Sequence, residues 1–230
     1  MHIGGMQKLT LLDYPGKVAC TIFLSGCNLR CPYCHNPGLV LPEQSNGPGI
    51  SETELFSFLE QRKGKLDGVC VTGGEPTLQP GLPEFLKKLR DLGYVTKLDT
   101  NGTNPGMLRE LLHDDLLDYV AMDIKNSPSR YAETCGGLNV LSKVQESTAL
   151  LLDSPVEYEF RTTVCKPLHT EKEMKEIGRW LKGAKQYFLQ PFVDSGALVG
   201  TGVSPLSEEE IKALRDSVLP YIPNTQIRGQ

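Results

Sequence analysis

Six short runs rich in β-branched and aromatic residues alternate with longer amphipathic segments along most of this 230-residue chain. The expected strands are residues 17–24, 68–71, 94–98, 119–124, 156–164 and 186–190. The expected helices are residues 51–63, 83–92, 105–113 and 139–152, and two more that begin at Thr170 and Ser207. Such an alternation predicts an α/β fold built on a parallel sheet with right-handed crossovers.

The number of these units limits the architecture further. Six strand–helix units fall short of the eight that close a full barrel, which usually needs about 250 residues. The pattern therefore predicts a partial (βα)6 barrel of parallel strands, with a flat doubly wound sheet as the alternative. We expect one domain over residues 1–230, with its core at about 17–192 and a C-terminal helix at about 207–220.

Charge and hydropathy exclude several classes of protein. Lys and Arg total 24 against 28 Asp and Glu, which gives a net charge of −4 and no long basic run. This balance argues against nucleic-acid binding. No apolar run approaches the roughly 20 residues of a membrane span, and the N-terminus lacks the pattern of a signal peptide. We expect a cytoplasmic protein that binds neither nucleic acid nor a membrane.

The chain contains seven cysteines, an odd number that cannot all pair. Disulfide frameworks belong to small secreted domains, which this chain does not resemble. Cys27, Cys31 and Cys34 lie within eight residues and are interpreted as metal ligands. The remaining cysteines are expected to be ordinary buried thiols whose individual roles the sequence does not assign. They are Cys20, Cys70, Cys135 and Cys165.

The spacing of the three clustered cysteines bears on which metal they bind. A closed structural zinc site needs four ligands, and here the fourth would be His35, directly after Cys34. A 4Fe–4S cluster suits three close thiolates better, because each thiolate can bind one iron at a corner of the cluster. The fourth iron would then be open to a small molecule. A zinc-stabilised binding domain without catalysis remains the non-enzyme alternative.

Nearly every predicted strand ends in, or runs into, polar or glycine-rich residues. They are Ser25-Gly26-Cys27, Thr72-Gly73-Gly74-Glu75-Pro76, Asp99-Thr100-Asn101-Gly102, Asp123 with Lys125, Arg161, and Gln190-Pro191. In parallel α/β folds the C-terminal ends of the strands line the ligand site. We therefore expect all six strand ends to converge on one cavity.

The motifs resemble those of a known superfamily. The segment Gly26-Cys27-Asn28-Leu29-Arg30-Cys31-Pro32-Tyr33-Cys34-His35-Asn36-Pro37 resembles the cluster loop of radical S-adenosylmethionine (SAM) enzymes, and Gly73-Gly74-Glu75-Pro76 resembles their methionine-binding motif. Cys34-His35-Asn36 and the short chain resemble activases of glycyl-radical enzymes. The opening residues, Ile3-Gly4-Gly5 with Lys8 and Leu12-Asp13-Tyr14-Pro15-Gly16-Lys17, are similar to the anaerobic ribonucleoside-triphosphate reductase activating proteins. The resemblance extends to about Pro191.

The resemblance implies a reaction and its partners. SAM would bind the open iron, and one electron from the cluster would cleave it to methionine and a 5′-deoxyadenosyl radical. That radical would take a hydrogen from a glycine Cα of a partner enzyme, which the resemblance identifies as anaerobic ribonucleotide reductase. The resemblance also implies flavodoxin or ferredoxin as the electron donor. The alternatives are an activase of pyruvate formate-lyase or another glycyl-radical enzyme, and a small-molecule enzyme such as 7-carboxy-7-deazaguanine synthase. Val193 stands where some pyruvate formate-lyase activases carry a histidine.

The resemblance also implies roles for residues beyond the three cysteine ligands. Tyr33 and the backbone at His35 would lie against the adenine. Gly73 and Gly74 would let their carbonyls approach the SAM ammonium group. Glu75 would fix that turn or meet the ammonium, with a solvent-facing loop acid as the alternative.

Four further residues complete the expected site. Asp99 and Asp123 match activase positions that hold a monovalent cation and the methionyl carboxylate, whereas a helix cap or loop hydrogen bond is the alternative for each. Lys125 would add a positive charge. Arg161 matches an activase arginine near the cofactor, with a surface ion pair as the alternative. His169 belongs to no motif and is expected in a surface or capping position. No catalytic residue is expected beyond the cluster and cofactor ligands.

Overall fold

The computed structural model describes residues 1–41, 47, 49–194 and 196–229. Its centre is one sheet whose eight strands follow one another in chain order. The strands are β1 (Ile3–Thr10), β2 (Ala19–Leu24), β3 (Gly68–Gly73), β4 (Val95–Thr100), β5 (Tyr119–Asp123), β6 (Glu157–Val164), β7 (Tyr187–Pro191) and β8 (Thr225–Ile227). Strands β2 to β8 are parallel, and β1 pairs antiparallel with β2.

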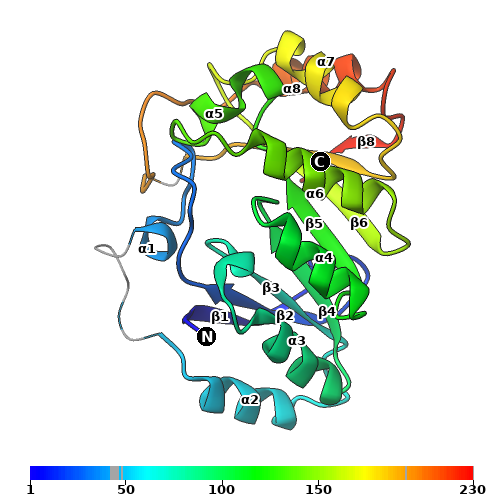
Figure 1. Cartoon of the computed structure of the whole chain (residues 1–230). Helices are drawn as coiled ribbons and strands as arrows, with labels where there is room; N and C mark the ends of the chain where they lie inside the picture. Colours follow the sequence, from blue (N-terminus) through cyan, green and yellow to red (C-terminus); the bar gives the residue numbers. More distant parts are fainter. Residues whose placement is uncertain (42–46, 48, 195, 230) are drawn as a thin grey trace.

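The strand order decides between the two predicted architectures. A doubly wound sheet reverses its strand order at a switch point, whereas this sheet runs from β1 to β8 without a reversal. Among the described residues, β1 and β8 are the two ends of the sheet and do not pair with each other. The α/β fold with an open, curved parallel sheet is therefore confirmed (Figure 1).

The six predicted strands correspond to β2–β7, each within two residues at either end. The sequence did not predict β1 or β8. Gly4 and Gly5 weaken the strand pattern of β1, because glycine is depleted in strands, and β8 has only three residues. Both are edge strands, so they extend the sheet without changing its parallel centre.

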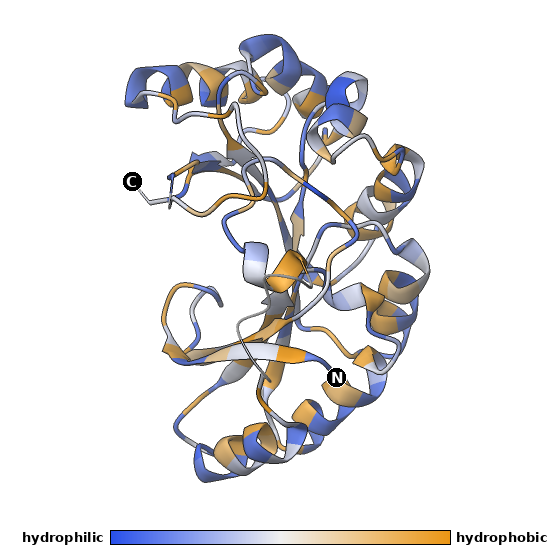
Figure 2. Ribbon diagram, turned by 90° about the vertical axis from the view of Figure 1, so that its left-hand side faces the viewer, coloured by the Kyte–Doolittle hydropathy of each residue, from blue (hydrophilic) through white to orange (hydrophobic). Residues whose placement is uncertain are grey.

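The longer helices lie along the outer side of the curved sheet, as Figures 1 and 2 show together. They are α2 (Glu52–Gln61), α3 (Leu82–Asp91), α4 (Pro105–His113), α6 (Leu141–Leu152), α7 (Glu171–Trp180) and α8 (Glu208–Val218). The shorter helices are α1 (Pro37–Val40), η2 (Pro76–Leu78), η3 (Pro128–Arg130) and α5 (Tyr131–Thr134). Within the described part of the chain, no helix has the length and hydrophobicity needed to cross a membrane.

Helix starts follow local sequence signals. Ser51 and Thr170, where the sequence predicts helices to begin, each form a capping box: the side chain accepts a backbone N–H, and the glutamate three residues later bonds back. Ser207 forms a third capping box at the start of α8. These reciprocal bonds satisfy N–H groups that the first helical turn leaves without partners.

Strand alternation sorts the core from the site. In β2, Ile22 and Leu24 are fully buried in the hydrophobic core, whereas Thr21 and Phe23 line the cavity on the other face. In β4, Leu98 belongs to the core and Asp99 to the cavity wall. Because successive side chains point to opposite faces of a sheet, one face packs against the helices and the other presents polar groups on the concave side.

Candidate active site

A cavity of about 330 Å³ opens on the concave side of the sheet. Each of the strands β2 to β7 contributes a residue at or just beyond its C-terminal end, so the strand ends meet in one cavity as their parallel order requires. All residues that the sequence proposed for the site lie on this wall. They are Cys27, Cys31, Tyr33, Cys34, His35, Gly73, Gly74, Glu75, Asp99, Asp123, Lys125 and Arg161.

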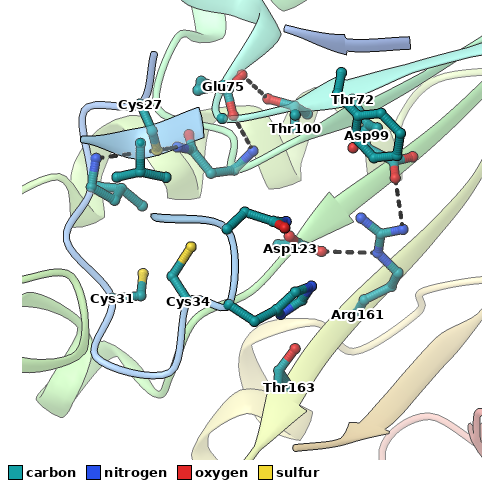
Figure 3. Close-up of a pocket in the computed structure, with 18 of the residues that line it drawn as sticks. Cys27, Cys31, Cys34, Thr72, Glu75, Asp99, Thr100, Asp123, Arg161 and Thr163 are labelled. Carbon is teal, nitrogen blue, oxygen red and sulfur yellow. Dashed lines mark hydrogen bonds and ion pairs between the residues drawn. The ribbon is translucent and has the colours of Figure 1, made fainter. Parts of the chain in front are cut away.

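The three clustered cysteines lie on the segment after β2, residues 25–36, here called the cysteine loop. Neighbouring segments brace this loop through its backbone. Val199 donates its N–H to the Cys34 carbonyl at 3.0 Å, and Gly200 donates to the Pro32 carbonyl at 3.1 Å. Arg30 donates to the Cys135 carbonyl at 3.4 Å. Segments far apart in the sequence thus hold the three thiols on one side of the cavity (Figure 3).

The donor set of this loop fits an iron–sulfur cluster. Such clusters are held by cysteine thiolates, and three thiols on one cavity wall supply that chemistry. Burial raises the pKa of Cys27 to about 11. The neighbouring Cys135 thiol, as a hydrogen-bond partner, lowers the pKa of Cys31. Cys135 carries no sequence motif, so only the fold reveals that it lies beside a proposed cluster ligand.

Two glycines at the end of β3 pack closely against the end of β2 and the start of the cysteine loop. A Cβ on Gly73 would lie 2.2 Å from the Leu24 carbonyl oxygen, and one on Gly74 would lie 2.1 Å from the Gly26 carbonyl oxygen. Gly73 also has a φ of 128°, which side-chain-bearing residues rarely adopt. Close backbone packing of Gly73 on β2 and of Gly74 on the cysteine loop therefore requires both glycines, in addition to the expected approach of their carbonyls to a ligand.

Glu75 ties this turn to the end of β4. Its side chain is 1% exposed, which excludes the solvent-facing alternative. The carboxylate accepts hydrogen bonds from Thr77 N at 3.1 Å, Thr77 Oγ1 at 2.5 Å, Thr100 Oγ1 at 2.7 Å and Asn101 N at 2.6 Å. Burial raises the pKa of Glu75, although these four donors act in the opposite direction. The geometry is that of a residue that fixes the turn.

We expect Glu75→Gln to lower the free energy of unfolding by about 1–3 kcal/mol. The amide NH2 would face donors such as Asn101 N–H and Thr77 N–H, and a buried donor would lose its acceptor. Denaturant unfolding measures the change. The control is Glu110→Gln on α4, where the glutamate is exposed and lies outside the first helical turn, and we expect it to leave the free energy unchanged. Equal stability of the two variants would contradict the structural role of Glu75.

Two acids and two basic residues form a chain of ion pairs across the cavity floor. Arg161 Nη1 lies 3.0 Å from Asp99 Oδ2, and Arg161 Nε lies 2.9 Å from Asp123 Oδ1 (Figure 3). Lys125 Nζ lies 3.0 Å from Asp123 Oδ2. Arg161 is only 9% exposed, so the surface ion pair considered for it is wrong. The bonds of both acids are also not those of a helix cap.

The pKa shifts follow from this arrangement. Burial raises the pKa of Asp99 and of Asp123, but Arg161 and a lysine partner outweigh burial and hold both values below the usual range. Burial lowers the pKa of Lys125, and Asp123 more than offsets it, so that the net shift is upward. Both carboxylates and the Lys125 ammonium are therefore charged at neutral pH.

Tyr33 and His35 lie at different depths. Tyr33 is buried and donates its hydroxyl to the Lys125 carbonyl at 3.4 Å, whereas His35 is exposed at the cavity edge. The expectation for His169 is wrong, because its ring is buried beside Tyr33 with 6.2 Å between the ring centroids. His169 Nε2 lies 3.0 Å from the Lys125 carbonyl oxygen. It therefore supports the wall of the site, where no sequence motif had placed it.

Comparison with known proteins identifies the family. Residues 21–181 match the model of the Radical SAM superfamily, so this chain belongs to that superfamily and is an enzyme of radical SAM chemistry. Membership of this superfamily rules out the alternative that the chain is a zinc-stabilised binding domain without catalysis.

Individual proteins within the superfamily show which members this chain is similar to. A Methanocaldococcus jannaschii protein named "Putative glycyl-radical enzyme activating enzyme" is 32% identical over 98% of this chain and 95% of its own length. The pyruvate formate-lyase-activating enzyme of Clostridium pasteurianum is 37% identical over 54% of this chain, which spans about half, 52%, of that relative. The crystal structure of Streptococcus suis SuiB bound to SAM superimposes with a TM-score of 0.69 at 15% identity, over 88% of this chain and 48% of that one. This last similarity concerns the fold.

Proposed function

We propose that this chain is an activase that uses SAM and a 4Fe–4S cluster to generate a glycyl radical on a partner enzyme. The observation that carries the proposal is the similarity to a glycyl-radical enzyme activating enzyme over nearly the whole of both chains. The cavity supports it, because three cysteine thiols share its wall with charged groups. The proposed partner is anaerobic ribonucleoside-triphosphate reductase, on the strength of the opening residues and of the LDYPGK segment at residues 12–17.

Different residues of the cavity would have different roles in the reaction. Cys27, Cys31 and Cys34 would hold the cluster. When bound, the reduced cluster would supply the electron that cleaves SAM to methionine and a 5′-deoxyadenosyl radical, and this radical would take a hydrogen atom from the partner's glycine. The protein's own contribution is to orient the cofactor and exclude competing reactions. A flavodoxin or ferredoxin is the proposed electron donor.

The charged and polar groups would hold SAM at its two ends. Lys125 and Arg161 would offer positive charge to the methionyl carboxylate of SAM, while the carbonyls of Gly73 and Gly74, at the end of β3, would accept hydrogen bonds from the methionyl ammonium. Tyr33 and the backbone at His35 would lie against the adenine. A monovalent cation at the two aspartates, which the resemblance implies, is the one expected component that the ion pairs of this chain disfavour.

Electron paramagnetic resonance tests the activity and the partner together. Cluster-loaded, reduced protein is mixed anaerobically with SAM and the anaerobic ribonucleotide reductase of the same source. We expect a doublet from a glycyl radical that requires both SAM and this chain. A parallel reaction with pyruvate formate-lyase should give no doublet.

Each of the other outcomes would refute a different part of the proposal. Formation of 5′-deoxyadenosine without a doublet on any glycyl-radical enzyme would refute the activase role and favour a small-molecule substrate such as that of 7-carboxy-7-deazaguanine synthase. A doublet on pyruvate formate-lyase alone would refute only the proposed partner. No SAM cleavage by protein with a full cluster would refute the proposed function altogether.

A further inference from the structure

The two aspartates of the site have no free carboxylate oxygen. Asp99 Oδ1 accepts from the Lys97 ammonium, and Asp99 Oδ2 accepts from Arg161 at 3.0 Å. Asp123 Oδ1 accepts from Arg161 at 2.9 Å, and Asp123 Oδ2 accepts from Lys125 at 3.0 Å. All four oxygens therefore bind a cationic side chain of this chain itself.

Lys97 occupies an unusual position for a lysine. Its side chain is 1% exposed, and lysine is almost never fully buried unless it is paired. It lies on β4 two residues before Asp99, so both side chains point to the concave face of the sheet. Its ammonium also lies 3.7 Å from the Cys70 sulfur and 5.8 Å from the centre of the Tyr119 ring. The interior of the sheet thus encloses this charge from several strands.

The local charge count disfavours a further cation. Within the ion-pair group, Lys97, Arg161 and Lys125 carry three positive charges against the two negative charges of Asp99 and Asp123. Asp13, a further acid on the cavity wall, accepts a hydrogen bond from Thr21 and bonds to none of these cations. A sodium or potassium ion binds through oxygen atoms, and here it would compete with a side-chain cation at every oxygen of these two partly buried carboxylates. The surplus of one positive charge instead suits the carboxylate of a bound amino acid.

We propose that the Lys97 ammonium takes the place at Asp99 that a monovalent metal cation would otherwise fill, so that SAM binding by this chain requires no such cation. Lys97 is then a positioning residue, which acts on the cofactor through Asp99 and Arg161. This inference rests on the proposed binding of SAM in this cavity. It is independent of which enzyme receives the radical.

The wild-type protein provides the first test. The dissociation constant of SAM is measured by anaerobic calorimetry on cluster-loaded protein in potassium, sodium and N-methyl-D-glucamine chloride at equal ionic strength. We expect the three values to agree within about twofold. A tenfold or greater loss of affinity in N-methyl-D-glucamine, relative to potassium or sodium, would overturn the inference. Failure to bind SAM in every salt would instead refute the proposed function.

Removal of the Lys97 ammonium should make SAM binding depend on a monovalent cation. We expect Lys97→Gln and Lys97→Met to bind SAM about tenfold more weakly than wild type in N-methyl-D-glucamine, and potassium or sodium to restore most of that loss. Folded variants whose affinity does not respond to the cation would show that Lys97 does not substitute for one. The matched control is Lys88→Met, an exposed lysine on α3 that should behave as wild type in all three salts.

Thermal unfolding without SAM gives a second readout. In the Lys97 variants a cation that binds the vacated oxygen of Asp99 stabilises the folded state by mass action, so the unfolding midpoint should rise with potassium or sodium concentration. We expect no such specific rise for the wild-type protein or for Lys88→Met, in which both carboxylate oxygens of Asp99 keep their cationic partners. A specific rise in the wild-type midpoint would contradict the inference without any reference to activity.

Discussion

Cys31→Ala should abolish the cluster and with it the cleavage of SAM. Loss of one of three thiolates leaves two on the cysteine loop, and we expect the iron content of reconstituted protein to fall from about four per chain to a small fraction of that value. SAM cleavage should decrease at least about 100-fold, because a ligand contributes more than the outer-shell partners whose loss costs 10–100-fold. Iron analysis and 5′-deoxyadenosine formation measure the two effects.

A buried thiol outside the cavity serves as the control. Cys20 lies on β2 in the hydrophobic core, on the face opposite the cavity, so Cys20→Ala should retain both the cluster and the cleavage activity. Cys34→Ala should reproduce the loss seen with Cys31→Ala. If Cys31→Ala retained a full cluster while its fold was intact by circular dichroism, the assignment of the three ligands would be wrong.

Arg161→Met should damage both stability and cofactor binding. Arg161 bonds to both Asp99 and Asp123, and its removal leaves two partly buried carboxylates without their shared counter-charge. Breaking a fully buried ion pair costs about 3–5 kcal/mol in the free energy of unfolding, and this range is the upper bound for these partly exposed acids, each of which keeps a lysine partner. We also expect SAM affinity to decrease at least about tenfold, because the positive surplus of the site is lost. Denaturant unfolding and calorimetry measure these two quantities.

The pH dependence identifies the cause of this instability. In the wild-type protein the pKa of each aspartate is lowered, so the stability they contribute is present above about pH 4 and lost as the pH falls. Without Arg161 the two carboxyls protonate more easily in the folded state. The difference in stability between Arg161→Met and wild type should therefore shrink below about pH 4.

Arg228→Met separates the loss of stability from the loss of function. Arg228 bonds to both carboxylate oxygens of the buried Glu159, at 2.8 and 2.7 Å, and lies outside the cavity. We expect this variant to be destabilised as well but to bind SAM within about twofold of wild type. Equal SAM binding by Arg161→Met and wild type would refute the proposed role of Arg161 at the site.

Much of this arrangement could be predicted because it depends on local patterns. Strands β2–β7 and the capped helices follow from residue periodicity and from capping residues such as Ser51 and Thr170. The site was predictable as a set because parallel strands bring their C-terminal ends to one edge, which places polar residues such as Asp99 and Asp123 together. The three candidate cluster ligands could be predicted from the spacing of the cysteines in the cysteine loop alone.

The ion pairs between side chains on different strands could not be predicted from the sequence. Strand register aligns Asp123 with Arg161, and Arg161 also reaches Asp99 one strand further on. No spacing within the chain indicates these contacts, because the residues are separated by 38 and 62 positions. The sequence left Arg161 with a surface ion pair as its alternative, and the fold places it in the cavity with two partners.

The sequence by itself determined the class of fold, the three candidate cluster ligands and the edge of the sheet where the site lies, because periodicity, spacing and strand direction are local properties of the chain. Only the tertiary structure decided how the charges of the site are balanced. The burial of Lys97, the four bonds of Glu75 and the position of Cys135 beside Cys31 arise from packing between distant segments. The energy of a charge or a thiol depends on these neighbours and on its burial, and neither is encoded in the local sequence.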